Sequence, residues 1–177
     1  MTVAEGVVAA LVILVLAAAL WRGYRFAPWA PTRRRDIARV VRHAALKPGE
    51  CFVELGCGDG RVLAAIAAAP GARVIGVERS WALACIARLR VARTQNARVV
   101  WGDLFAYDVS SADVVYCFGM PRALAGAVSE KLLRELKSGA RVISYVFAIP
   151  GLPHETVYRD RVDDLPLYSY RMTRVLG

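Results

Sequence analysis

Short apolar runs alternate with longer helical stretches from residue 51 to residue 147, and this alternation most restricts the fold. Five runs have the length and apolar content of buried strands: Cys51–Leu55, Arg73–Val77, Ala97–Trp101, Val114–Phe118 and Arg141–Phe147. Three stretches between them are predicted as helices: Arg61–Ala69, Trp81–Arg93 and Arg122–Lys137. Parallel strands need a crossover connection, and that connection is right-handed. The sequence therefore predicts the α/β class, with a mostly parallel sheet covered by helices on both faces.

Regular structure is also predicted on either side of residues 51–147. One helix precedes them, because four apolar residues have helical spacing: Ile37, Val40, Val41 and Ala44. Thr32 is the candidate N-cap of this helix. After the last run, Glu155–Val162 and Leu165–Thr173 alternate with period two around a turn-prone pair of aspartates. This pattern predicts a C-terminal β-hairpin that closes one edge of the sheet.

The N-terminal residues are the most apolar part of the chain. Val7–Trp21 is an uninterrupted apolar run, and the twenty residues from Thr2 contain only Glu5 and Gly6 as interruptions. Twenty helical residues span roughly the 30 Å of a bilayer core. No Lys or Arg precedes the run, so we expect an uncleaved signal anchor instead of a secretory signal peptide. The alternative is a buried core helix.

Arginines follow the apolar run, and the positive-inside rule then predicts that the rest of the chain faces the cytoplasm. We predict a transmembrane helix over 1–22, a juxtamembrane linker over 23–32 and a folded domain over 33–177. The expected location is the plasma membrane, crossed once, with the domain on the cytoplasmic side. The sequence has no Arg-rich presequence, which makes the mitochondrial inner membrane the less favoured location.

The positive charge is concentrated near the predicted anchor. The chain has 24 Lys and Arg against 15 Asp and Glu, and residues 1–50 hold eight of the basic and three of the acidic residues. A basic segment beside a membrane helix fits anionic lipid. Nucleic acid is an unfavoured partner, because basic and aromatic residues do not alternate as they do in nucleic-acid readers. The four cysteines and two histidines lack metal-ligand spacing, so no metal site is predicted.

A glycine-rich loop follows the first predicted strand. Gly56, Gly58 and Gly60 lie between this strand and the next helix, where open α/β sheets bind their ligands. A dinucleotide loop would read Gly-x-Gly-x-x-Gly, but Arg61 occupies the third glycine position of that register. Glu54 comes just before the glycines, where a carboxylate would repel phosphate and attract an ammonium. The loop therefore predicts a cationic ligand.

The acid-x-Gly-x-Gly-x-Gly pattern resembles the S-adenosylmethionine loop of class I methyltransferases. The resemblance implies a Rossmann-like methyltransferase sheet and assigns cofactor binding to six loop residues: Glu54, Gly56, Cys57, Gly58, Asp59 and Gly60. It also implies that Glu78 accepts hydrogen bonds from the ribose hydroxyls and that Asp103 accepts one from adenine N6. Thr32 is a further candidate for closing over the cofactor. The alternative for Glu78 and Asp103 is a capping or solvated loop acid.

The segment after the fourth predicted strand bears on the methyl acceptor. Enzymes that methylate planar nitrogens commonly carry Asn/Asp-Pro-Pro-Tyr/Phe there, whereas this chain reads Phe118-Gly119-Met120-Pro121. An adenine or amide acceptor is therefore disfavoured, and an aliphatic amine is favoured. We place Phe118, Gly119 and Pro121 around the acceptor, with Tyr116 as the candidate catalytic residue. The alternative is that Tyr116 and Phe118 belong to the strand's buried core.

Several segments resemble the small lysine methyltransferases related to the mitochondrial ATP synthase c-subunit lysine methyltransferase and its archaeal homologues. They are Leu55–Arg61, Phe118–Pro121, Glu130–Leu132, Gly139–Ile143 and Phe147–Pro150. The resemblance implies methylation of a protein lysine, and a membrane anchor favours an acceptor on a membrane protein. The chain departs from the family at Cys57, Arg122 and Val146, where the family usually has Ser, Gln and Arg. Two alternatives stay open, namely a lipid or small membrane amine as acceptor, and a non-catalytic membrane adaptor on the same fold.

Overall fold

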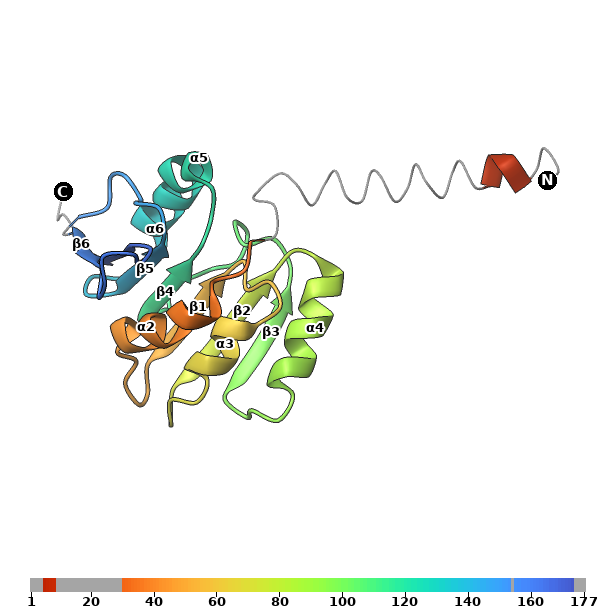
Figure 1. The fold of residues 1–177 in the computed structure, drawn as a ribbon, viewed down its shortest axis with the longest axis horizontal. Coiled ribbons are helices and arrows are strands. Elements are labelled where there is room, and N and C mark those ends of the chain that lie inside the picture. The colour runs from red at the N-terminus through yellow and green to blue at the C-terminus, as the bar shows by residue number, and fades with distance from the viewer. Residues whose placement is uncertain (1–4, 9–29, 154, 174–177) are drawn as a thin grey trace. The chain divides into compact units, whose positions relative to one another are not determined.

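The computed structural model describes residues 5–8, 30–153 and 155–173. Contacts divide the chain between Ala30 and Pro31, and the description below concerns the second unit, Pro31–Gly177 (Figure 1). Within the described ranges, no helix is long and apolar enough to cross a membrane. The predicted anchor over 1–22 lies outside these ranges except at residues 5–8, and so does the predicted linker up to residue 29.

A seven-stranded sheet forms the centre of the unit, in the order β3-β2-β1-β4-β5-β7-β6. The strands are β1 (Cys51–Leu55), β2 (Arg73–Glu78), β3 (Ala97–Trp101), β4 (Val114–Cys117), β5 (Arg141–Tyr145), β6 (Glu155–Tyr158) and β7 (Leu167–Arg171). The first five pair in parallel, β7 pairs antiparallel with β5, and β6 pairs antiparallel with β7. The predicted parallel sheet and its C-terminal hairpin are thereby confirmed.

The helices cover both faces of the sheet. They are α2 (Arg34–Ala44), α3 (Arg61–Ile66), α4 (Trp81–Val91), α5 (Pro121–Ala123), the wider helical turn η1 (Leu124–Val128) and α6 (Ser129–Glu135). The chain steps from β1 through β2 to β3 in one direction and from β4 to β5 in the other. Right-handed crossovers therefore place α3 and α4 on one face and α6 on the opposite face. Helix α2 packs beside α3, which packs beside α4 (Figure 1).

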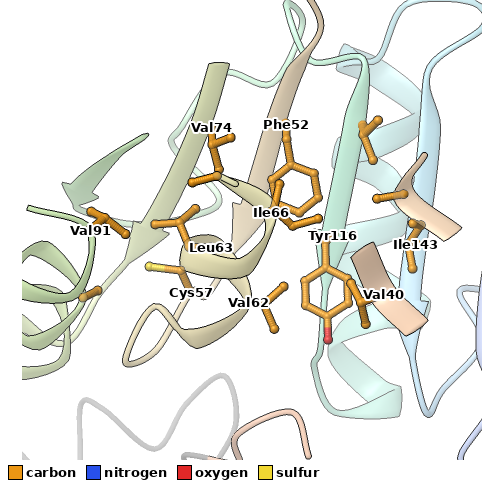
Figure 2. Packing of buried hydrophobic residues seen from close by; sticks show 14 of the residues in the cluster. Val40, Phe52, Cys57, Val62, Leu63, Ile66, Val74, Val91, Tyr116 and Ile143 are labelled. Atoms are coloured by element: carbon orange, nitrogen blue, oxygen red, sulfur yellow. The ribbon is translucent and has the colours of Figure 1, made fainter. Parts of the chain in front are cut away.

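The core between the sheet and helices α2 and α3 fixes the start of α3. Phe52 and Val74 of the sheet pack with Leu63 and Ile66 of α3 and with Val40 of α2, and all five are at most 1% exposed (Figure 2). Burying one such side chain stabilises the fold by about 1.5–3 kcal/mol. The glycine loop joins β1 to α3, so this packing sets the positions of both of its ends.

Two predicted elements differ in the structure. The predicted helix over Arg122–Lys137 is interrupted at Gly126, where φ is −110° and ψ is −109°. The last parallel strand stops at Tyr145 because the next residue, Val146, has a positive φ of 73°. The Ser144 hydroxyl also donates to the Phe147 carbonyl at 2.6 Å and so closes a turn there. A β-branched residue with positive φ is strained, and this one lies beside the predicted acceptor site.

The predicted role of Thr32 as the N-cap of α2 is wrong. The N-cap is Arg33, and its side chain makes no capping hydrogen bond. Thr32 is buried and uses its hydroxyl for a contact with β4. A partner from a distant strand thus outcompetes the local capping bond, which the sequence pattern alone did not indicate.

Candidate functional site

The glycine loop bends at the carboxyl ends of β1 and β2. Gly56, Gly58 and Gly60 have φ values of 81°, 53° and 76°, a conformation that glycine adopts without the steric cost of a side chain. The backbone N–H groups of Gly56 and Cys57 donate to the Val77 carbonyl at 2.9 and 3.0 Å. The loop is therefore fastened to the end of β2. Its three glycines lie where left-handed backbone is required.

The Glu78 carboxylate ties this loop to the next helix. Oε2 accepts the Gly58 N–H at 2.9 Å, and Oε1 accepts the Ser80 N–H at 2.7 Å. Ser80 is the N-cap of α4, so one side chain connects the glycine loop to the start of that helix. A carboxylate has about four acceptor positions, which leaves capacity for ligand hydroxyls. The assignment of Glu78 to ribose binding stays a prediction.

Glu54 is a buried acid in the middle of the sheet. Its Cα is opposite Gly76 of β2 and Tyr116 of β4, and the residue is 5% exposed. Burial raises the pKa of Glu54 well above its usual value, and the charges of Asp59 and Glu78 act in the same direction. Among the described residues, Oε2 of Glu54 has no hydrogen-bond partner. An unpartnered buried carboxyl oxygen suits a cationic donor.

Asp59 is engaged by arginines of this chain. Its Oδ2 lies 2.9 Å from Nη2 of Arg61 and 2.7 Å from Nη1 of Arg90. Burial opposes ionisation of Asp59, but the two guanidinium groups outweigh it and lower its pKa to about 2. The carboxylate therefore connects the loop to α3 and α4. The Cys57 side chain is also turned inward, because its Sγ packs against Gly76.

Asp103 caps the turn that follows β3. The residue is exposed, and its Oδ1 accepts the Phe105 N–H at 3.0 Å. This contact matches the capping alternative considered from the sequence, and the adenine role stays a prediction. Lys131 holds the same turn from α6, because its Nζ donates to the Tyr107 carbonyl at 2.5 Å. Lys131 is 2% exposed and forms an ion pair with Glu135, four residues later in the same helix. This i, i+4 spacing of opposite charges is the sequence signal that could have indicated the pair.

Tyr116 and Thr32 form a buried pair at the carboxyl end of β4. Their hydroxyl oxygens are 2.7 Å apart, and the residues are 1% and 5% exposed. Figure 2 shows the Tyr116 ring beside Val40 and Val62. Burial raises the pKa of Tyr116 well above its usual value, so the phenol stays protonated at neutral pH and does not act as a base. Its predicted contact with the acceptor stays a prediction, and in the structure its hydroxyl is hydrogen-bonded to that of Thr32.

The other predicted acceptor residues follow β4 directly. Phe118 is half-buried and meets Tyr145 of β5 edge to face, with ring centroids 4.9 Å apart. Gly119 is buried, and Pro121 is exposed as the first residue of α5. Tyr145 was not predicted as a site residue from the sequence, and its hydroxyl donates to the buried Asp36 carboxylate at 2.6 Å. Aromatic side chains at the ends of two neighbouring strands therefore meet beside the predicted acceptor position.

We expect the Thr32–Tyr116 contact to stabilise the fold. Either Thr32→Val or Tyr116→Phe leaves one buried hydroxyl without its partner and should lower the free energy of unfolding by about 1–3 kcal/mol. The double variant should lose less than the sum of the two, because no hydroxyl is then left unpaired. Urea unfolding of the full chain measures all three. Thr156→Val, at an exposed position of β6, is the control and should change little. Additive losses would contradict this contact.

The residues at this edge of the sheet suit a cationic ligand with ribose hydroxyls. Glu54 presents an unpartnered carboxyl oxygen, and Glu78 retains acceptor capacity next to the bent backbone. The Glu78 carboxylate beside the loop disfavours a pyrophosphate there, because like charges repel. S-adenosylmethionine carries an ammonium, a sulfonium and a ribose. The donor and acceptor set therefore fits that cofactor, with Glu54, Glu78 and the backbone of residues 56–60 as the groups that would hold it.

Known proteins match this chain in sequence and in fold. Residues 54–156 match the ANTKMT methyltransferase domain. A protein-lysine N-methyltransferase of Saccharolobus islandicus is 36% identical over 132 residues, which are 70% of this chain and 79% of that protein. The human lysine N-methyltransferase of the ATP synthase c-subunit is 31% identical over 145 residues, 80% of this chain but only 61% of its own length.

The fold also matches solved structures. An RNA methyltransferase of Salinibacter ruber in complex with S-adenosyl-L-homocysteine superimposes with a TM-score of 0.74 at 24% identity, over 84% of this chain and 97% of that one. This likeness concerns the fold alone. The domain match covers more than half of the chain, and the archaeal relative exceeds 30% identity over most of its length. The chain is therefore an S-adenosylmethionine-dependent methyltransferase that belongs to the ANTKMT methyltransferase domain family.

Proposed function

We propose that this enzyme methylates lysine side chains of protein and that residues 1–22 anchor it in the plasma membrane with the catalytic domain on the cytoplasmic side. The observation that carries the lysine assignment is the 36% identity to the Saccharolobus protein-lysine N-methyltransferase. Relatives from human and rat are named lysine methyltransferases of the ATP synthase c-subunit, and they support the same acceptor class.

An amine acceptor must be deprotonated before it reacts. From a reference pKa of about 10.4, removing the proton from a lysine ammonium at pH 7 costs roughly 4.6 kcal/mol. When bound, the cofactor supplies a methyl group on a cationic sulfonium. The half-buried Phe118 and its neighbour Tyr145 provide an apolar wall that disfavours the ammonium form of an entering lysine. The ends of β4 and β5 hold these rings in place, which favours an aligned approach of the amine.

The membrane location rests on the sequence of the N-terminal segment. The apolar run Val7–Trp21, with arginines only after it, is typical of a single anchor whose C-terminal side is cytoplasmic. A tethered enzyme meets acceptors in the same membrane at a raised effective concentration. A lysine of a membrane protein is therefore the favoured acceptor. The mitochondrial inner membrane is the less favoured location.

A labelling experiment tests the acceptor class. The purified full chain is incubated with methyl-labelled S-adenosylmethionine and with membranes from cells that lack the gene, and the protein and lipid fractions are then separated. We expect label in protein, recovered as methylated lysine after acid hydrolysis. Label confined to lipid would instead establish the lipid-amine alternative. A chain that binds S-adenosylhomocysteine but labels neither fraction would favour the adaptor alternative.

A further inference from the structure

Helix α4 and the edge strand β3 present an unusual apolar surface. Trp81, Ile86 and Leu89 of α4 are 62%, 45% and 79% exposed, and Trp101 of β3 is 56% exposed. The opposite side of α4 is also apolar, because Ala84, Ala87 and Val91 are buried against the sheet. A helix on the surface of a protein in water normally has a polar outer face. We call these four exposed residues, with the arginines around them, the α4–β3 surface.

The stretch of chain that forms this surface contains basic residues and no acidic ones. Between Glu78 and Asp103 the chain has five arginines and no Asp or Glu: Arg79, Arg88, Arg90, Arg93 and Arg98. In the part of the chain that the structure describes, Arg90 alone of these five forms an ion pair, with Asp59. Arg79, Arg93 and Arg98 are exposed. Their charge is therefore available to an anionic partner.

The combination of residue types identifies the partner. Exposed Trp, Leu and Ile flanked by Arg, without acids, are typical of a helix that lies in the interface of an anionic membrane. Tryptophan is favoured at the headgroup level, and arginine pairs with lipid phosphate. Other exposed apolar residues of the body, such as Leu133 of α6 and Val157 of β6, lie on other elements. Isolated residues of this kind are ordinary on protein surfaces.

We propose that the α4–β3 surface docks on anionic phospholipid headgroups. This inference rests on the membrane location in the proposed function, and it adds a second contact between the enzyme and the membrane. The surface adjoins the cofactor site, because Glu78 directly precedes it and Asp103 closely follows it in the chain. Trp101 Nε1 donates to the Arg79 carbonyl at 3.0 Å and so joins the ends of β3 and β2. Docking would therefore hold the carboxyl edge of the sheet near the bilayer.

Cys85 provides a reporter on this surface. It lies on α4 and is partly exposed, whereas Cys51, Cys57 and Cys117 are buried. The full chain is reconstituted into vesicles of phosphatidylcholine alone or of phosphatidylcholine with phosphatidylglycerol, and a water-soluble maleimide modifies Cys85. We expect modification to be about tenfold slower with phosphatidylglycerol, as for a surface docked roughly nine-tenths of the time. High salt should abolish this difference, because it screens the arginines. Cys85→Ser measures background labelling.

Two variants should remove the protection, and one should keep it. Leu89→Glu and Arg93→Glu place a negative charge on the α4–β3 surface and should give equally fast modification with both lipids. Leu133→Glu adds the same charge at a half-exposed position of α6 and should leave the protection intact. Equal rates for the unaltered chain in both vesicles would refute the proposal. Equal protection in both lipids and in detergent would also refute it, because another part of the chain or a second copy then covers the surface.

Flotation of the same samples separates this proposal from the proposed anchor. A chain that floats with both vesicle types but shows no protection of Cys85 refutes docking and keeps the anchor. A chain that floats only with phosphatidylglycerol, with Cys85 protected, supports docking and refutes the anchor. Failure to float with either vesicle refutes both.

Discussion

Replacing Glu78 by alanine is expected to weaken binding of S-adenosylhomocysteine by about 100-fold. The carboxylate accepts the backbone N–H groups of Gly58 and Ser80, and the family resemblance assigns it the ribose hydroxyls as well. A hydrogen bond to a charged group contributes about 1.5 kcal/mol or more. Losing the bonds to the two ribose hydroxyls therefore costs about 3 kcal/mol of binding free energy, or roughly 100-fold in affinity. Calorimetric titration of the full chain measures the change.

Asp113→Ala is the matched control for this experiment. Its Oδ2 accepts the Cys51 N–H at 2.8 Å, so the variant also removes a bond between a carboxylate and the backbone of the sheet. Cys51 is the first residue of β1, at the end of the sheet opposite the glycine loop. The control should lose stability but keep its affinity for S-adenosylhomocysteine. A folded Glu78→Ala chain with unchanged affinity would exclude Glu78 from the cofactor site.

The parallel sheet was predictable because its strands are encoded locally. The predicted strands Cys51–Leu55 and Ala97–Trp101 have the bounds that the structure gives to β1 and β3. Glycine at 56, 58 and 60 likewise indicated a bent loop, and all three have positive φ. In each case the signal lies within a few residues, either as an apolar run between turns or as a backbone shape that glycine adopts at low cost.

The contacts that hold the site together were not predictable in the same way. Thr32 meets Tyr116 across 84 residues, and Arg90 reaches Asp59 across 31. Such partners depend on which strands become neighbours and on how α4 is rotated, and neither is encoded in local spacing. Asp59 shows the consequence. Its place in the loop indicated a cofactor contact, which stays a prediction, but gave no sign of the ion pairs that the Asp59 carboxylate forms with Arg61 and Arg90.

Replacing Gly60 by alanine is expected to lower the free energy of unfolding by about 2–5 kcal/mol. Gly60 has a φ of 76°, which costs an L-residue about 1–2 kcal/mol. An added Cβ would also lie 2.9 Å from Cβ and 3.0 Å from Cα of Ala87 in α4. Because the Cα belongs to the backbone of a helix, it cannot rotate away, and such overpacking typically costs about 1–3 kcal/mol. Thermal unfolding should show a Tm lower by roughly 6–15 °C.

Gly139→Ala separates the two contributions at Gly60. Gly139 has a φ of 85°, but an added Cβ there would have no atom within 4 Å, so only the backbone cost of about 1–2 kcal/mol is expected. Equal losses in the two variants would mean that contact with Ala87 contributes nothing. The affinity of the remaining folded Gly60→Ala chain for S-adenosylhomocysteine then decides what the third glycine does. Unchanged affinity assigns Gly60 to the packing of α3 on α4, whereas weakened binding assigns it also to the cofactor loop.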